Sequence, residues 1–220
     1  MRRKKMERIW VGRVRVVLSV LLVWMGVGLG GCGLLSALGF GDGDEVIDPK
    51  IPVEGKRILV IPFEGPQLPY FEDEEGRQLA RAIVQDVQKN RDYTDLKSIF
   101  EKDNLEEYIT LYFPHISWKK VAEMAQADWV LVGSILSFQT SRPGDVGLLR
   151  GSAVVDIRLY DRCKDRFILK ERIQTRFPKR ETHGVFINSR NIIYEGLIRE
   201  TAYRIGRLFY SYVAREDPLR

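Results

Sequence analysis

A cysteine near the amino terminus offers the clearest covalent chemistry in this 220-residue chain. Cys32 directly follows Gly30 and Gly31, and these two small residues end an apolar segment. A signal peptidase admits small side chains beside the bond that it cuts, so the sequence predicts cleavage just before Cys32. The new terminal cysteine would then carry a thioether-linked lipid. Cys32 is therefore our candidate lipidation site.

The residues before Cys32 have the charge pattern of an export signal. Residues 1–15 hold seven Lys or Arg and one Glu, and residues 16–29 carry no charge. This uncharged stretch suits the apolar part of a signal peptide, whereas a membrane-spanning helix needs about 20 apolar residues. With Cys32 it resembles a bacterial lipoprotein signal peptide, which we place at 1–31. An uncleaved signal anchor is the alternative.

The rest of the sequence holds little catalytic or metal-binding chemistry. The two histidines, His115 and His183, have a spacing that suits neither a metal site nor a catalytic triad. A G-x-G-x-x-G pattern at 26–31 lies inside the signal, so it cannot join a strand to a helix as a dinucleotide site requires. Cys163 has no partner for a disulfide within the chain once Cys32 is lipidated. We expect no catalytic, metal-binding or cofactor-binding residues, and no enzyme.

Most of the basic character belongs to the signal. The whole chain has a formal net charge of +5, of which residues 1–31 contribute +6, so the remainder has a net charge of −1. The high isoelectric point therefore gives no reason to expect a nucleic-acid partner. Charge is uneven within this remainder, because residues 32–149 carry −8 and residues 150–220 carry +7. Such asymmetry could orient a domain against an anionic surface, or it could reflect two solvated faces.

Residues 32–56 have the composition of a tether. They are rich in glycine, contain a short acidic run, and show little apolar periodicity. A flexible chain of this length has a root-mean-square span of roughly 25–30 Å. We therefore expect the folded part, 57–220, to stay close to the membrane that holds the lipid.

Residues 57–220 are predicted to form one compact α/β domain with a mixed sheet, an antiparallel hairpin and a helical layer. Continuous apolar runs predict buried strands, and apolar residues at helical spacing predict amphipathic helices. Alternating apolar and charged residues predict the hairpin, with its turn at 161–165. The predicted strands are 57–63, 96–99, 127–136, 153–160 and 167–177. One predicted helix begins at the acidic residues 73–75, and three others cover 105–113, 118–126 and 189–214.

Two predicted loops carry apolar side chains that turns do not require. One contains Leu68, Tyr70 and Phe71, and the other contains Phe186 beside basic residues. Exposed aromatic residues in loops are candidate contacts for a protein partner. The alternative is that both loops fold back and cover the ends of the sheet.

The order of these elements resembles a group of bacterial periplasmic domains. An opening strand that ends in Ile-Pro-Phe at 61–63 is followed by a helix, an Ala-Asp-Trp-Val-Leu-Val-Gly-Ser strand at 127–134, a hairpin and a closing helix. The group includes the soluble domain of the curli-secretion lipoprotein, the lipoprotein activators of penicillin-binding proteins, and the amino-terminal domain of the Tol translocation protein. The resemblance implies an α/β fold. It transfers no binding residue, because no family binding motif matches this sequence.

These features favour a lipid-anchored, non-enzymatic envelope protein that binds another envelope protein as an assembly or regulatory factor. The lipid on Cys32 would hold it to a membrane and face it toward the periplasm. Gly33 stands where an Asp would signal retention in the inner membrane, so the outer membrane is favoured. The alternative is a subunit of an oligomeric outer-membrane secretion pore. The sequence also leaves open whether the chain forms a homo-oligomer.

Overall fold

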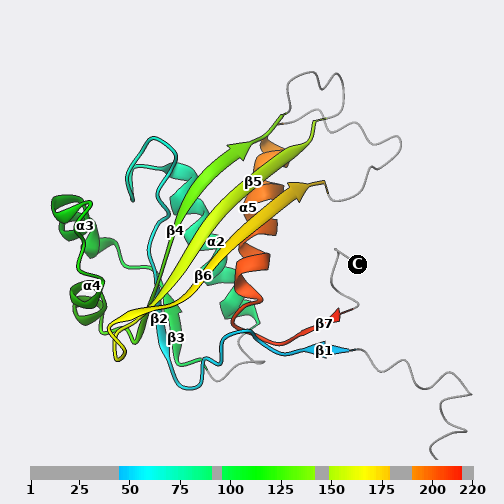
Figure 1. The fold of residues 1–220 in the computed structure, drawn as a ribbon. Coiled ribbons are helices and arrows are strands. Elements are labelled where there is room, and N and C mark those ends of the chain that lie inside the picture. The colour runs from blue at the N-terminus through cyan, green and yellow to red at the C-terminus, as the bar shows by residue number, and fades with distance from the viewer. Residues whose placement is uncertain (1–44, 91–95, 142–148, 179–189, 215–220) are drawn as a thin grey trace, which may run out of the picture. The chain divides into compact units, whose positions relative to one another are not determined.

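The computed structural model describes residues 45–90, 96–141, 149–178 and 190–214, and the described residues from 46 onward form one compact unit. This unit contains a five-stranded sheet, a two-stranded sheet and four α-helices among the described residues (Figure 1). The elements in chain order are β1 (Val46–Ile47), β2 (Arg57–Val60), α2 (Glu74–Lys89), β3 (Ser98–Phe100), a 3₁₀ turn (Asp103–Leu105), α3 (Glu106–Tyr112), α4 (Trp118–Ala125), β4 (Trp129–Gln139), β5 (Gly151–Asp161), β6 (Arg166–Phe177), α5 (Arg190–Gly206) and β7 (Tyr212–Val213).

The large sheet is mixed, as the sequence predicts. Its strand order is β3-β2-β4-β5-β6. Strands β3, β2 and β4 run parallel, and β4, β5 and β6 run antiparallel. The parallel neighbours of β2 require crossover connections, which α2 and the α3–α4 segment provide. The hairpin β5–β6 turns at 162–165, which confirms the predicted turn.

The central strands are buried on both faces. On one face, Ile58 and Leu131 pack with residues of α2 and α5. On the other face, Leu59, Val130 and Val132 pack with residues of α3 and α4. This two-sided burial explains why β2 and β4 have continuous apolar sequences rather than alternating ones. Figure 1 shows α2 and α5 side by side across one face of the sheet.

Two predicted helix starts are confirmed. The side chain of Asp73 accepts a hydrogen bond from the Gly76 N–H at 2.8 Å and caps α2. The side chain of Ser117 accepts a hydrogen bond from the Lys120 N–H and caps α4. Each cap satisfies a backbone donor that the first helical turn leaves without a partner.

The final helix is shorter than predicted. It ends at Gly206, not at 214, because the backbone turns at 207–209 and places Phe209 and Tyr210 in the core. The chain then forms β7, which pairs antiparallel with β1. The apolar spacing of residues 208–213 imitates a helix because a turn and a short strand also bring their apolar residues to the core.

The folded unit also begins earlier than predicted. Residues 46–56, assigned to the tether from composition, include β1 and the buried side chains of Ile51 and Val53. The Ile51 N–H donates to the Leu208 carbonyl oxygen at 3.0 Å. The few apolar residues of this segment are enough to fix it against the end of α5, which a composition average does not reveal.

A partly buried hydrogen bond ties α2 to the segment after α5. The Tyr210 hydroxyl donates to Asp86 Oδ2 at 2.7 Å. Burial raises the pKa of the Asp86 carboxyl, although the hydrogen bond from Tyr210 opposes this shift. The folded state therefore binds the Asp86 proton more tightly than the unfolded state, where the pKa is about 3.9. Asp86 alone makes the protein less stable as the pH rises from below this value through its folded pKa.

We expect Asp86→Asn to remove this pH dependence, because asparagine keeps an acceptor for Tyr210 but does not titrate. Urea unfolding at pH 3.5 and pH 7 should show that the stability of Asp86→Asn relative to the natural protein increases with pH. Other titrating groups are common to both proteins and cancel in the comparison. Tyr210→Phe, which removes the opposing hydrogen bond, should strengthen the dependence. A relative stability that is constant or decreases with pH would contradict this account.

Candidate protein-binding surface

The loop predicted to contact a partner is largely buried. Leu68 is exposed, but the side chains of Tyr70 and Phe71 expose only 4% and 3% of their surface. The loop folds back at Phe71, where φ is 66°, and the Glu72 N–H donates to the Tyr70 carbonyl oxygen at 2.7 Å. The prediction that Tyr70 and Phe71 form an exposed contact surface is therefore wrong. Phe186 and Cys32, the predicted lipidation site, lie outside the described residues.

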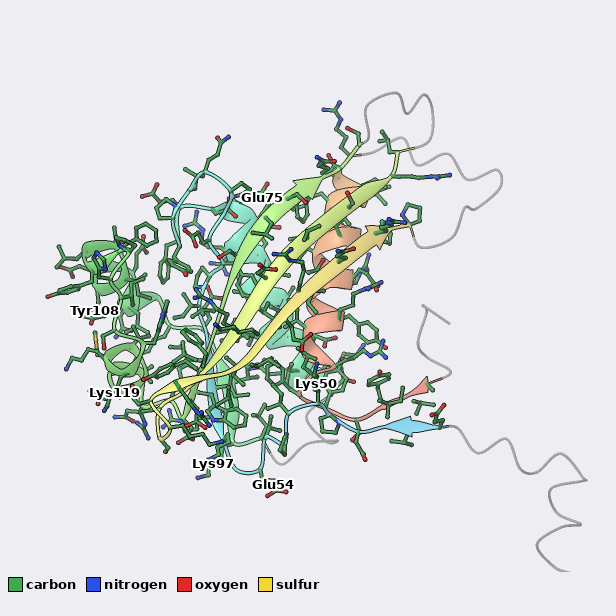
Figure 2. All side chains as sticks on the ribbon, in the orientation of Figure 1. Lys50, Glu54, Glu75, Lys97, Tyr108 and Lys119 are labelled. Carbon is green, nitrogen blue, oxygen red and sulfur yellow. The ribbon has the colours of Figure 1, made fainter. Side chains whose placement is uncertain are left out.

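Exposed apolar side chains occur instead at the end of α3. Leu111, Tyr112 and Phe113 are consecutive and expose 71%, 50% and 43% of their surface. We call these three residues the α3 patch. Leu105 and Ile109 provide the opposite, buried side of the same segment. Figure 2 shows Tyr108, one helical turn before Tyr112, on the side of the molecule away from α5.

Ring contacts hold the α3 patch on a fixed base. Tyr70 meets Phe113 edge-on, with 6.1 Å between ring centroids, and it meets Trp118 of α4 in the same way at 5.9 Å. Tyr108 and Tyr112 are in contact at 4.7 Å. The buried loop tyrosine therefore supports the aromatic surface instead of forming it. Aromatic residues on a fixed base can bind a partner with little further loss of conformational freedom.

The Tyr70 hydroxyl connects this region to the sheet. Its pKa is raised, first by burial and then by the Glu64 carboxylate, while the Arg158 guanidinium of β5 lowers it. Glu64 in turn accepts a hydrogen bond from the Ser134 hydroxyl of β4 at 3.1 Å. Tyr70 therefore stays a neutral phenol near pH 7.

The described residues contain no group of three or more His, Cys, Asp or Glu side chains that could hold a metal ion. His115 is exposed in the connection between α3 and α4. Cys163 is an exposed free thiol in the β5–β6 turn, where the Asp161 carboxylate accepts hydrogen bonds from the N–H groups of Cys163 and Lys164. Within the described ranges, no helix has the length and apolar character needed to cross a membrane.

Sequence reasoning missed the α3 patch, although a signal for it exists. The predicted helix 105–113 contains apolar residues on more than one side, and a short amphipathic helix can bury only one side. Three consecutive apolar residues, Leu111 to Phe113, cannot all face the same core. The sequence pattern therefore requires that part of this helix end be exposed.

No protein family model matches the chain, and no curated protein matches its sequence. Solved structures are similar to it in fold. The PelC dodecamer from Paraburkholderia phytofirmans is 10% identical with a TM-score of 0.45, covering 76% of this chain and 97% of that one. Lipoprotein GNA1162 from Neisseria meningitidis is 16% identical with a TM-score of 0.40, covering 55% and 82%. The LpoB C-terminal domain from Salmonella enterica is 13% identical with a TM-score of 0.33, covering 64% and 92%. Of these three proteins, GNA1162 is named as a lipoprotein.

Proposed function

We propose that this protein is a lipid-anchored, non-enzymatic component of the bacterial envelope that binds another envelope protein through the α3 patch. Cys32 would carry the lipid, and the domain would face the periplasm, on the outer membrane. The observation that carries the proposal is the exposure of Leu111, Tyr112 and Phe113 together on a fixed aromatic base. Isolated exposed apolar residues are common, whereas three consecutive ones, two of them in contact with other aromatic rings, are candidates for a protein-binding surface.

The lipid and the patch would act together. Anchoring on Cys32 confines the protein to a membrane surface, so a contact with a partner in the same envelope gains effective concentration. A modest apolar patch is then sufficient for specific binding. Tyr112 is well suited to this role because its ring provides apolar area and its hydroxyl can bond to the partner.

We expect the variant Leu111→Ala/Tyr112→Ala to lower recovery of one specific envelope protein by roughly tenfold, which corresponds to about 1.4 kcal/mol of binding free energy. The measurement is quantitative affinity capture from cross-linked envelopes. Both side chains are exposed, so we expect the variant to keep its thermal unfolding midpoint. Phe113 is left in place because it contacts the buried Tyr70.

The matched control is Val46→Ala/Ile192→Ala, which truncates two exposed apolar side chains on other elements. It should leave recovery of the partner unchanged. If both variants recover the same proteins as the natural chain, the α3 patch does not bind a partner. Recovery of this chain alone, as large rings, would support the pore subunit instead of the partner-binding protein.

A further inference from the structure

The described residues leave part of one face of the large sheet without a covering helix. Strands β4, β5 and β6 are 11, 11 and 12 residues long. Helices α2 and α5 cover one face of these strands, whereas α3 and α4 lie over only one end of the other face (Figure 1). On this second face of β4, Val132 is buried, Ser134 is half-buried and Leu136 is exposed. The part of the chain that the structure describes places no helix beyond Val132.

We call this uncovered region the open sheet face. It forms a hollow of about 550 Å³ between β4 and β6. Its lining residues come from all three strands of the antiparallel part of the sheet. They are Ser134, Leu136, Asp156, Ile157, Arg158, Lys170, Glu171 and Arg172.

Once the ion pairs of the open sheet face are set aside, its remaining charged side chains are positive. Asp156 accepts two hydrogen bonds from Arg172, at 2.6 and 2.7 Å, and these bonds lower the pKa of the Asp156 carboxyl. The other lining carboxylate, Glu171, forms an ion pair with Lys50. Both acidic groups are therefore neutralised by neighbours. Arg158, which also interacts with the Tyr70 hydroxyl, and Lys170 are the other cations that line the hollow.

A further cation extends the same side of β6. Successive side chains of a strand alternate between faces, so Arg176 shares a face with Arg172 and Lys170. Arg176 is opposite Ser152 of β5 in the sheet register, beyond the Asp156–Arg172 pair. At the other end, the Arg158 guanidinium lies 4.9 Å from the centroid of the Phe167 ring, which positions it. The open sheet face therefore presents a row of fixed or exposed cations beside an apolar leucine.

The shape of the open sheet face bears on whether its anionic partner is a membrane surface or a protein. A membrane surface is flat on the scale of one domain, so it complements a hollow in the sheet less closely than a protein surface does. A protein surface has projecting side chains that can fill it, with carboxylates for the cations and an apolar residue for Leu136. Arg and Lys bind carboxylates through charge-assisted hydrogen bonds, which gain strength as water is displaced.

We propose that the open sheet face binds a carboxylate-rich surface of a partner protein. This inference rests on the proposed function, since it assigns a second contact and a charge to the envelope partner. The two contacts are separable: the α3 patch supplies apolar binding at one end of the domain, and the cations of the open sheet face select an acidic partner.

The test places a photo-reactive amino acid at Leu136, on the open sheet face, or at Leu111, on the α3 patch, of the full chain in living cells. Cross-linked peptides are identified by mass spectrometry, which reads the chemistry of the partner directly. We expect Leu136 to cross-link a peptide of another protein that is rich in Asp and Glu. In the variant Lys170→Glu/Arg176→Glu this product should fall by about tenfold. The matched control Lys120→Glu/Arg199→Glu makes the same change in net charge on α4 and α5 and should leave the product unchanged.

Several outcomes would overturn the inference. A Leu136 product with phospholipid, with a neutral or basic peptide, or with a second copy of this chain would show that the occupant is not an acidic partner protein. An unchanged product in Lys170→Glu/Arg176→Glu would show that the cations do not recognise it. If Leu111 cross-links a protein but Leu136 cross-links none, the open sheet face is not a contact and the proposed function stands. If neither position cross-links a protein, the proposed function fails as well.

Discussion

Gly76→Ala is expected to destabilise this domain strongly. Gly76 lies in the first turn of α2, and a β-carbon at this position would stand 2.0 Å from the carbonyl oxygen and 2.8 Å from the carbonyl carbon of Phe63. These are backbone atoms, so no change of side-chain rotamer relieves the overlap. The helix would have to move away from the end of β2.

The position of Phe63 leaves little room for that movement. Its N–H donates to the Gly76 carbonyl oxygen at 3.3 Å, and its fully buried ring lies directly over Gly133 of β4. A displaced Phe63 would therefore disturb both α2 and β4. Overpacking costs about 1–3 kcal/mol, and more where the backbone must shift, while a domain is stable by only about 5–15 kcal/mol. We expect a loss of at least about 3 kcal/mol.

Urea unfolding monitored by circular dichroism tests this expectation. The matched control is Gln78→Ala, which introduces alanine two positions later on the same helix and should change stability by less than about 1 kcal/mol. A midpoint for Gly76→Ala equal to that of the natural protein would mean that α2 can shift on the sheet without cost. The contact between Gly76 and Phe63 would then not define the position of the helix.

The elements that the sequence predicts correctly are those with one dominant local signal. The continuous apolar run that begins β4 predicts burial on both faces, and Trp129 to Val132 are buried. The alternation of Val155, Asp156 and Ile157 assigns each face of β5, and the acidic residues before α2 include its cap, Asp73. In each case the neighbouring residues in the chain carry the information, so tertiary contacts are not needed to interpret it.

The incorrect predictions concern residues whose environment is set by distant parts of the chain. Tyr70 belongs to a loop rich in proline, yet it is buried because Phe113 and Trp118, more than 40 positions later, stack against it. Ile51 is ordered by a hydrogen bond to the segment after α5. The sequence shows that these residues are apolar but does not show what covers them. The sequence does not predict the open sheet face for the same reason, since the placement of α3 and α4 determines which part of the sheet the described helices leave uncovered.

Cys32→Ser is expected to abolish lipid attachment completely. A thioether requires the cysteine thiol, and a serine hydroxyl does not replace it in this chemistry. In cells given radiolabelled palmitate, the natural chain should carry label and have a mass that lacks residues 1–31. The Cys32→Ser chain should carry no label and keep the mass of the uncleaved precursor. Two acyl chains hold a protein to a membrane stably, because each buried CH₂ contributes about 0.8 kcal/mol.

The second cysteine provides the matched control for this prediction. Cys163 is an exposed free thiol in the β5–β6 turn, so Cys163→Ser removes the other thiol of the chain without affecting the core. This variant should keep both the label and the processed mass. An unlabelled natural chain that retains residues 1–31 would contradict lipidation and identify the segment as an uncleaved signal anchor. The anchor would still hold the domain at a membrane, so the binding tests of the α3 patch and the open sheet face would stand independently of the result.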